Sequence, residues 1–143
     1  MSNVGRFKYG KLAKYPHMPA EDILTWEKFL EKYPDEYLSV DYDVHCGELT
    51  EHSDKAADLG IAGSEAVNQY KIDVVGYKKN SIDLIELKGK AVPAAIGQLA
   101  MYKSLYDKEV KPTVQTYPVI IAREESPFMA DCCKNEGVLL ILV

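Results

Sequence analysis

Two acidic residues and a lysine stand close together in the middle of the chain. Asp73 lies in a run rich in β-branched residues, 72–77, and Glu86 and Lys88 lie in the apolar run 82–88. Carboxylate oxygens are preferred ligands of hard divalent cations such as Mg²⁺. These residue types therefore predict a cation site in this part of the chain.

The two runs have the pattern of a β-hairpin whose register brings the two acids together. An even-numbered turn pairs Tyr77 with Ile82, and counting back along both strands pairs Asp73 with Glu86; an odd-length turn would break this register. Side chains alternate with period 2, so Lys88 projects from the same face. Like charges directly opposite each other destabilise a sheet, and we expect a bound cation to offset that repulsion.

The same residues resemble the core motif of a nuclease superfamily. Asp73, followed after twelve residues by Glu86 and Lys88, resembles the motif of the PD-(D/E)XK nucleases, with isoleucine where the family has proline. Gln98 and Tyr102 are similar to the Q-x-x-x-Y element of the RecB-like branch. The motifs occur together, in order and at these spacings. The resemblance extends from about residue 21 to residue 143, with an unmatched insert near residues 47–68.

The resemblance implies a nuclease that depends on Mg²⁺ or Mn²⁺ and hydrolyses phosphodiester bonds, with DNA as the expected substrate. Asp73 and Glu86 would bind the metal together with the backbone carbonyl of Leu87. Lys88 would orient the attacking water or stabilise the developing negative charge. The sequence does not distinguish DNA from RNA, or single strands from duplex.

Three further residues are expected to contact or position the substrate. The resemblance implies that Gln98 lies beside the metal and holds the nucleotide, and that Tyr102, one helical turn later, supports it. Lys90 belongs to a cluster of lysines around the hairpin, and we assign it to substrate binding.

The first helix is expected to supply another carboxylate. Apolar residues at helical spacing predict a helix over 21–33 that ends before Pro34. The resemblance implies a metal-ligating acid on this helix, and Glu27 is the candidate because it lies mid-helix at the edge of the apolar stripe. Glu21 and Glu31 remain alternatives.

The remaining pattern predicts one α/β domain. Its restriction-endonuclease-like core would be a central mixed β-sheet flanked by helices. The other expected elements are a strand over 37–46, a helix over 93–108, a strand over 117–122, a helix over 128–136 capped by Ser126 and Pro127, and a strand over 138–143 buried on both faces.

Two segments fall outside these elements. Residues 1–19 are expected to form a loose basic arm, and residues 47–69 a long polar loop that covers substrate or contacts a second copy. On the strand before that loop, Asp41, Asp43 and His45 are expected to face solvent; the alternative is that Asp43 or His45 approaches the metal.

Composition limits the mode of action. The formal net charge is −5, which argues against a general electrostatic grip on nucleic acid. The only arginines are Arg6 and Arg123, so base-specific readout is not expected, and structure-selective or nonspecific cleavage fits better. A homodimer or a larger repair or phage assembly would then help to bind DNA.

The sequence also predicts the cellular location of the protein and the state of its cysteines. No apolar run approaches the roughly 20 residues that span a bilayer, and the first residues lack a signal-peptide core, so we expect a cytoplasmic protein with no membrane association. Its three cysteines, Cys46, Cys132 and Cys133, are expected to be buried free thiols.

Two other interpretations compete with the nuclease. A catalytically silent subunit on a nuclease-like fold would bind nucleic acid or assemble with a partner without cleavage. A small α/β protein whose hairpin charges face solvent would show no metal-dependent rise in melting temperature.

Overall fold

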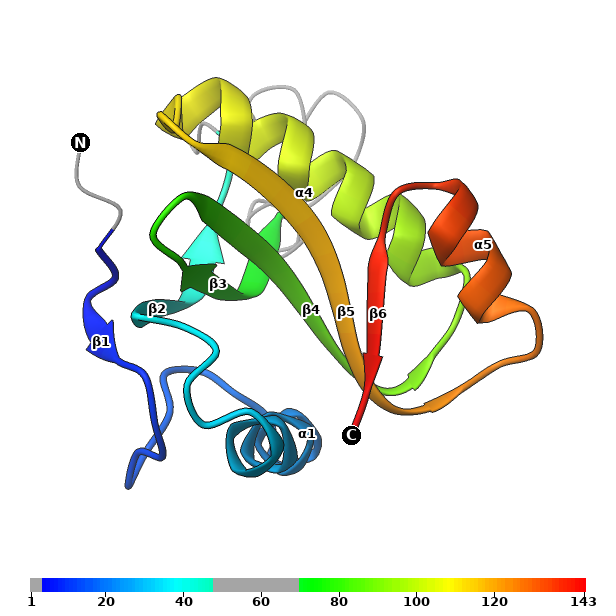
Figure 1. Ribbon diagram of the computed structural model, residues 1–143, viewed down its shortest axis with the longest axis horizontal. Coiled ribbons are helices and arrows are strands. Elements are labelled where there is room, and N and C mark those ends of the chain that lie inside the picture. The colour runs from blue at the N-terminus through cyan, green and yellow to red at the C-terminus, as the bar shows by residue number, and fades with distance from the viewer. Residues whose placement is uncertain (1–3, 48–69) are drawn as a thin grey trace, which may run out of the picture.

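The computed structural model describes residues 4–47 and 70–143, and a six-stranded mixed sheet forms its centre (Figure 1). The strands lie side by side in chain order. β1 to β4 pair antiparallel, and β4, β5 and β6 pair parallel. The strands are β1 (Phe7–Lys8), β2 (Ser39–His45), β3 (Lys71–Tyr77), β4 (Ser81–Ala91), β5 (Gln115–Glu125) and β6 (Leu139–Leu142).

Helices cover both faces of the sheet. The described helices are α1 (Ala20–Lys32), α4 (Ala94–Val110) and α5 (Met129–Asn135). Parallel strands need a crossover connection, and α4 and α5 provide the two crossovers that join β4 to β5 and β5 to β6. Both pack on one face, and α1 packs on the other (Figure 1). The α/β class and the mixed sheet predicted from the sequence are confirmed.

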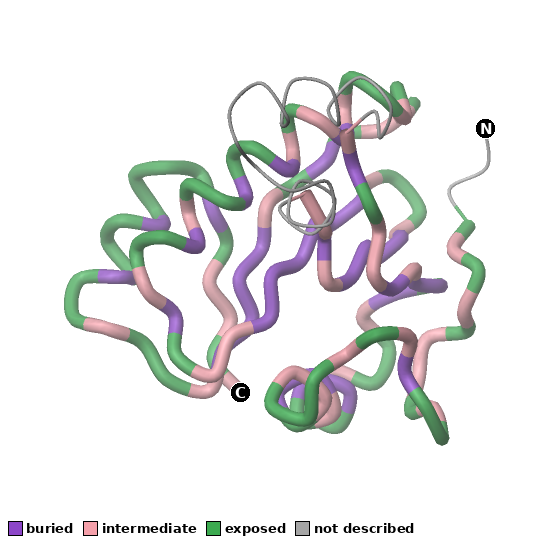
Figure 2. The backbone as a smooth tube through the Cα atoms, turned by 180° about the vertical axis from the view of Figure 1, so that it is seen from behind, coloured by how far each residue is buried: buried purple, intermediate pink, exposed green. Residues whose placement is uncertain are grey.

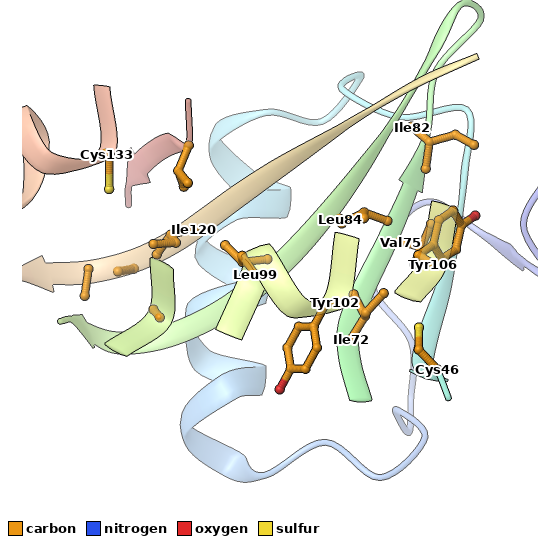
Figure 3. Close-up of a cluster of buried hydrophobic side chains, with 14 of the residues drawn as sticks. Cys46, Ile72, Val75, Ile82, Leu84, Leu99, Tyr102, Tyr106, Ile120 and Cys133 are labelled. Atoms are coloured by element: carbon orange, nitrogen blue, oxygen red, sulfur yellow. The ribbon is translucent and has the colours of Figure 1, made fainter. Parts of the chain in front are cut away.

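Each face has its own apolar core, and the buried backbone is concentrated in the central strands (Figure 2). On the α1 face, Trp26 stacks on Phe29 and donates a hydrogen bond of 3.0 Å from Nε1 to the hydroxyl of Tyr42. On the α4 face, Leu99 and Tyr102 lie over the aliphatic residues of β3 and β4 (Figure 3).

Local sequence explains where the two longer helices begin and end. Pro19 is the N-cap of α1, acidic residues occupy its first turn, and Pro34 disfavours its continuation. In α4 the buried positions are Ala95, Leu99, Tyr102 and Tyr106, which follow helical spacing. Lys111, in a left-handed conformation, caps its end.

The predicted hairpin register is confirmed. Tyr77 pairs with Ile82 and Val75 pairs with Leu84. The even-numbered turn therefore sets which side chains of β3 and β4 share a face.

The N-terminal segment is held more firmly than we expected. Phe7 and Lys8 pair with β2 as β1, Tyr15 is buried, and Lys11 forms an ion pair with Glu31. The prediction of a loose arm over residues 1–19 was wrong for this part, because aromatic side chains at positions 7, 9 and 15 pack into the core on the α1 face. The predicted polar loop over 47–69 lies, apart from Gly47, outside the described residues.

Three smaller expectations also fail. β6 is the last strand of the sheet and Leu139 is 53% exposed, so it is not buried on both faces. The strand expected over 37–46 is β2 (Ser39–His45), so Leu38 precedes it and is exposed. The N-cap of α5 is Phe128, in a left-handed conformation, and neither Ser126 nor Pro127 caps the helix.

Two further observations bear on the expected surroundings. All three cysteines are free thiols; Cys46 and Cys133 are buried as expected, and Cys132 is exposed. Over residues 4–47 and 70–143, no helix has both the length and the apolar character needed to cross a bilayer.

Candidate active site

Asp73 and Glu86 meet where strands β3 and β4 separate. The backbone ladder between the strands extends as far as the pair Val74–Ile85, so the two acids occupy the next position in register. Each carboxyl group affects the pKa of the other. The structure thus brings together the two acids that the hairpin pattern predicts to face each other.

Beyond this pair, a side-chain oxygen of Asp73 takes the place of a backbone carbonyl as the hydrogen-bond acceptor for β4. The backbone N–H of Leu87 donates a hydrogen bond of 2.8 Å to Asp73 Oδ2. In a strand, the N–H and C=O of one residue point toward the same neighbouring strand. The Leu87 carbonyl therefore also points toward Asp73. This direction is required if the carbonyl is the third metal ligand beside Asp73 and Glu86.

Glu86 is buried, and Asp73 is half-buried. Glu86 is 7% exposed, and its Oε2 is buried without a hydrogen-bond partner. Burial, and then the negative charge of Asp73, raise the pKa of Glu86 to about 9. Burial also raises the pKa of Asp73. At neutral pH the pair therefore retains a shared proton, which a divalent cation would displace.

Lys88 is the nearest cationic partner of this pair on β4. Its Nζ lies 3.7 Å from Glu86 Oε1, and its side chain is 30% exposed. Its positive charge acts on both acids of the pair. Lys88 therefore connects the buried carboxylates with the surface, where a phosphate group can approach.

Helix α1 contributes Asp22 to the site. Burial, and then the charge of Asp73, raise the pKa of Asp22 to about 6, and the charges of Lys88 and Lys71 oppose this rise. Among the causes of the raised pKa of Glu86 is the charge of Asp22. Asp22 therefore belongs to the same electrostatic group as the hairpin acids.

The three acids considered from the sequence have other partners. Glu27 accepts a hydrogen bond of 2.9 Å from the Tyr15 hydroxyl. Glu21 pairs with Arg123, and Glu31 pairs with Lys11. The structure thus brings Asp22, rather than Glu27, to Asp73.

A helical-wheel argument could have found Asp22. It lies four residues before Trp26 and seven before Phe29, in line with the buried stripe of α1. Glu27 is five residues further on, which rotates it about 140° around the helix.

Strand β2 adds Asp43, and β3 adds Lys71. The pairs Tyr42–Val74 and Val44–Ile72 place Asp43 opposite Asp73. Lys71 Nζ lies 3.3 Å from Asp43 Oδ1.

The side chain of Asp43 is only 12% exposed, so the expectation that it faces solvent was wrong. Asp41 is also mostly covered, and it accepts a hydrogen bond of 2.7 Å from the Tyr77 hydroxyl. His45 is exposed, with its Nε2 3.4 Å from Asp43 Oδ2.

A small pocket connects these groups with the N-terminal segment. It has a volume of about 10 Å³, and Asp22, Asp43, Lys71 and Asp73 form its charged wall. The segment from Pro16 to Pro19 completes its lining. The acids of α1, β2 and β3 therefore line one recess.

The predicted substrate-binding residues lie at different depths. Tyr102 is buried, and its pKa is raised to about 12 by burial and then by the charges of Glu86 and Asp73. Figure 3 shows its ring beside Ile72. Gln98, one turn earlier on α4, is exposed, and so is Lys90 on β4. The structure places Tyr102 close to the acids and leaves the other two at the surface.

The donor set can be tested against a divalent ion. Within the described part of the chain, no three side chains of His, Cys, Asp or Glu form a metal site by themselves. Asp73, Glu86 and the Leu87 carbonyl provide two carboxylates and one backbone oxygen. Mg²⁺ commonly binds through one or two carboxylates and keeps several waters. With Glu86 Oε2 free of other partners, these residues fit such an ion.

Comparisons with known proteins give no assignment. No protein-family model matches the chain, and neither a curated protein nor a solved structure gives a significant match. The chemistry of the site therefore has to be inferred from its own residues.

Proposed function

We propose that this chain is a metal-dependent nuclease that hydrolyses phosphodiester bonds of DNA, with a restriction-endonuclease-like core. The observation that carries the proposal is the position of Asp73 next in register to Glu86, where β3 and β4 separate, with the Lys88 ammonium group 3.7 Å from Glu86. Burying two adjacent carboxyl groups costs free energy unless a positive charge compensates them. We therefore expect this pair of carboxyl groups to bind a cation.

The sheet topology supports the fold assignment within this proposal. An antiparallel unit of β2, β3 and β4 continues into a parallel unit of β4, β5 and β6. The acids lie on β3 and β4, at the centre of the sheet and next to α1. This is the location that the resemblance to PD-(D/E)XK nucleases implies for a metal site.

In hydrolysis, water adds to phosphorus, the bond to the leaving oxygen breaks, and that oxygen gains a proton. A bound Mg²⁺ would activate the water and stabilise negative charge on the phosphate. Asp73, Glu86 and the Leu87 carbonyl hold the ion. Lys88 orients the water and stabilises the developing charge.

The remaining residues position the substrate. Gln98 and Lys90 are exposed and contact the nucleotide and the phosphate backbone, and Tyr102 supports Gln98 from one turn below. Asp22, in place of Glu27, orders the water around the ion. The net charge of −5 opposes binding to the phosphate backbone. The chain therefore binds DNA in the cytoplasm together with a second copy or with a partner in a repair or phage assembly.

A cleavage assay tests the proposal. Supercoiled plasmid and labelled single- and double-stranded oligonucleotides are incubated with the full chain and Mg²⁺ or Mn²⁺, and then with EDTA. Cleavage is expected only with the free metal. Lys88→Met is expected to lower the rate roughly 10²- to 10³-fold, as loss of one group that stabilises developing charge does.

Lys79→Met is the matched control, because Lys79 is exposed at the hairpin turn. It removes the same charge without touching the acids, and we expect cleavage to be unaffected. Metal-dependent cleavage that survives Lys88→Met unchanged would contradict the assigned mechanism. DNA binding without any cleavage would instead identify a silent binding or assembly subunit.

A further inference from the structure

Arg123 of β5 lies next to the position of Lys88 in the sheet. In the parallel pairing of β4 with β5, Lys88 and Lys90 are opposite the two residues that flank Arg123. Arg123 is therefore opposite Gly89, between the two lysines of β4. Lys90 is exposed, and the side chains of Lys88 and Arg123 are partly exposed. Three cations thus reach the surface from neighbouring positions of two central strands.

The guanidinium group of Arg123 lies directly over Gly89. A Cβ atom added at Gly89 would be 2.9 Å from Nη2 of Arg123 and 3.5 Å from Oε2 of Glu21. Gly89 lies within β4 and does not have the positive φ that favours glycine. Glycine inside a strand often marks the close approach of another group. Here the approaching group is the guanidinium, and a larger residue at position 89 would displace it.

Two contacts with α1 orient this guanidinium group. Its Nε donates a hydrogen bond of 3.2 Å to the hydroxyl of Thr25, which is fully buried. Its Nη2 forms an ion pair with Glu21, whose side chain is 73% exposed. An ion pair with a partner so exposed to water is weak. The buried contact therefore fixes the direction of the guanidinium, and another anion can replace the Glu21 carboxylate.

We propose that Arg123 binds a phosphate group of the DNA backbone beside the cleaved bond, and that Glu21 occupies the place of this phosphate in the free protein. The inference rests on the proposed function, because it takes DNA as the ligand. The five N–H donors of a guanidinium form a fork that fits phosphate and carboxylate oxygens alike. Glu21 therefore competes with DNA for Arg123, and DNA binding releases Glu21 to water.

DNA binding measured apart from cleavage tests the role of Arg123. The full chain is titrated into a labelled duplex oligonucleotide, and fluorescence anisotropy is followed in EDTA and in Ca²⁺, with a gel to show that the oligonucleotide stays intact. Arg123→Met is expected to weaken binding roughly tenfold, as loss of a hydrogen bond to a charged group does. It should also lower the slope of log K against log salt concentration by about 0.9, the value for one phosphate contact. A residue that only supports the fold would leave this slope unchanged.

The competition by Glu21 is tested with a matched charge change. Glu21→Gln is expected to strengthen binding roughly three- to tenfold, because it frees a charged donor group for phosphate. The control is Glu31→Gln, which removes an equally exposed carboxylate from the same helix, where it pairs with Lys11. Its effect should be smaller. In the Arg123→Met background, Glu21→Gln should add no more than Glu31→Gln does, because the two residues act on one phosphate.

Two further variants carry the test if Arg123→Met does not fold. Arg123→Lys keeps the charge, so the salt slope should stay while affinity falls roughly threefold with the loss of the forked contact. Gly89→Ala displaces the guanidinium at constant net charge and should weaken binding to a similar extent. Wild-type affinity in both variants would contradict the inference.

The outcomes separate this inference from the proposed function. Equal affinity and salt slope in the wild type and Arg123→Met would overturn the inference and leave the nuclease proposal intact. So would a gain from Glu21→Gln that is the same with and without Arg123. DNA binding through Arg123 without cleavage in Mg²⁺ or Mn²⁺ would overturn the nuclease proposal alone. No DNA binding by either the wild type or Glu21→Gln would overturn both.

Discussion

Asp22 in α1 and Asp73 in β3 form one acidic group, although 50 residues separate them in the sequence. Burial, and then the charge of Asp73, raise the pKa of Asp22 to about 6. Helix α1, on one face of the sheet, and the hairpin of β3 and β4, at its centre, therefore both supply acids to the same site.

The first prediction concerns the acid on α1. Asp22→Asn is expected to lower metal-dependent cleavage roughly 10- to 100-fold, as loss of an outer ligand partner does. Glu27→Gln is expected to change the cleavage rate less than about twofold, because Glu27 accepts a hydrogen bond from the Tyr15 hydroxyl and does not belong to the acidic group. Rates of oligonucleotide cleavage at saturating Mg²⁺ measure both. A larger loss for Glu27→Gln than for Asp22→Asn would restore the assignment made from the sequence.

The second prediction concerns stability without metal. The pKa of Glu86 is about 9 in the folded chain and 4.5 for an ordinary glutamate, so the folded state binds more protons between these values. The free energy of unfolding should therefore fall as the pH rises from about 4.5 to 9. In Glu86→Gln this fall should be smaller, because the amide cannot ionise. Urea unfolding in EDTA across the pH range provides the measurement, and identical slopes for the two proteins would contradict the account.

The third prediction concerns metal and pH together. A cation must displace the shared proton of Asp73 and Glu86, so Mg²⁺ should raise the melting temperature more at pH 9 than at pH 6. At a concentration of 100 times Kd, binding contributes about 2.7 kcal/mol, which corresponds to a rise of roughly 8 °C for a chain of this size. Differential scanning calorimetry with and without Mg²⁺ measures the rise. Equal rises in the wild type and in Glu86→Gln would place the ion elsewhere.

The fourth prediction concerns the packing beneath the hairpin. A Cβ added at Gly76 would lie 2.5 Å from the Tyr37 ring, whose hydroxyl donates a hydrogen bond of 2.7 Å to Asp83. Gly76→Ala should therefore destabilise the fold by about 1–3 kcal/mol. Gly97→Ala, in α4 and free of contacts within 4 Å, should stabilise it by up to about 1 kcal/mol. Urea unfolding separates the two; equal effects would mean that Tyr37 does not pack on Gly76.

The features predicted correctly from the sequence are those that depend on residues close together in the chain. An even-numbered turn sets the register of β3 against β4, and the period-2 alternation of side chains then brings Asp73 and Glu86 together. The order of apolar runs likewise predicted the mixed sheet and the helices on its faces. These features follow from short-range rules that the sequence displays directly.

The rest depends on contacts between distant segments. The place of Asp43 opposite Asp73 follows from the pairing of β2 with β3, which the intervening residues do not specify. The apolar run of β6 fits an edge strand as well as a central strand, because the sequence does not show whether another strand pairs with its free side. The packing of Tyr15 and the choice of Asp22 over Glu27 likewise depend on how α1 lies against the sheet.

The most direct test of the central claim is a crystal structure of the protein with Mn²⁺, with the ion located by anomalous scattering. The account predicts one peak within about 2–2.5 Å of a carboxylate oxygen of Asp73, a carboxylate oxygen of Glu86 and the backbone carbonyl of Leu87. No peak at these oxygens, in crystals where Mn²⁺ binds elsewhere or not at all, would contradict it.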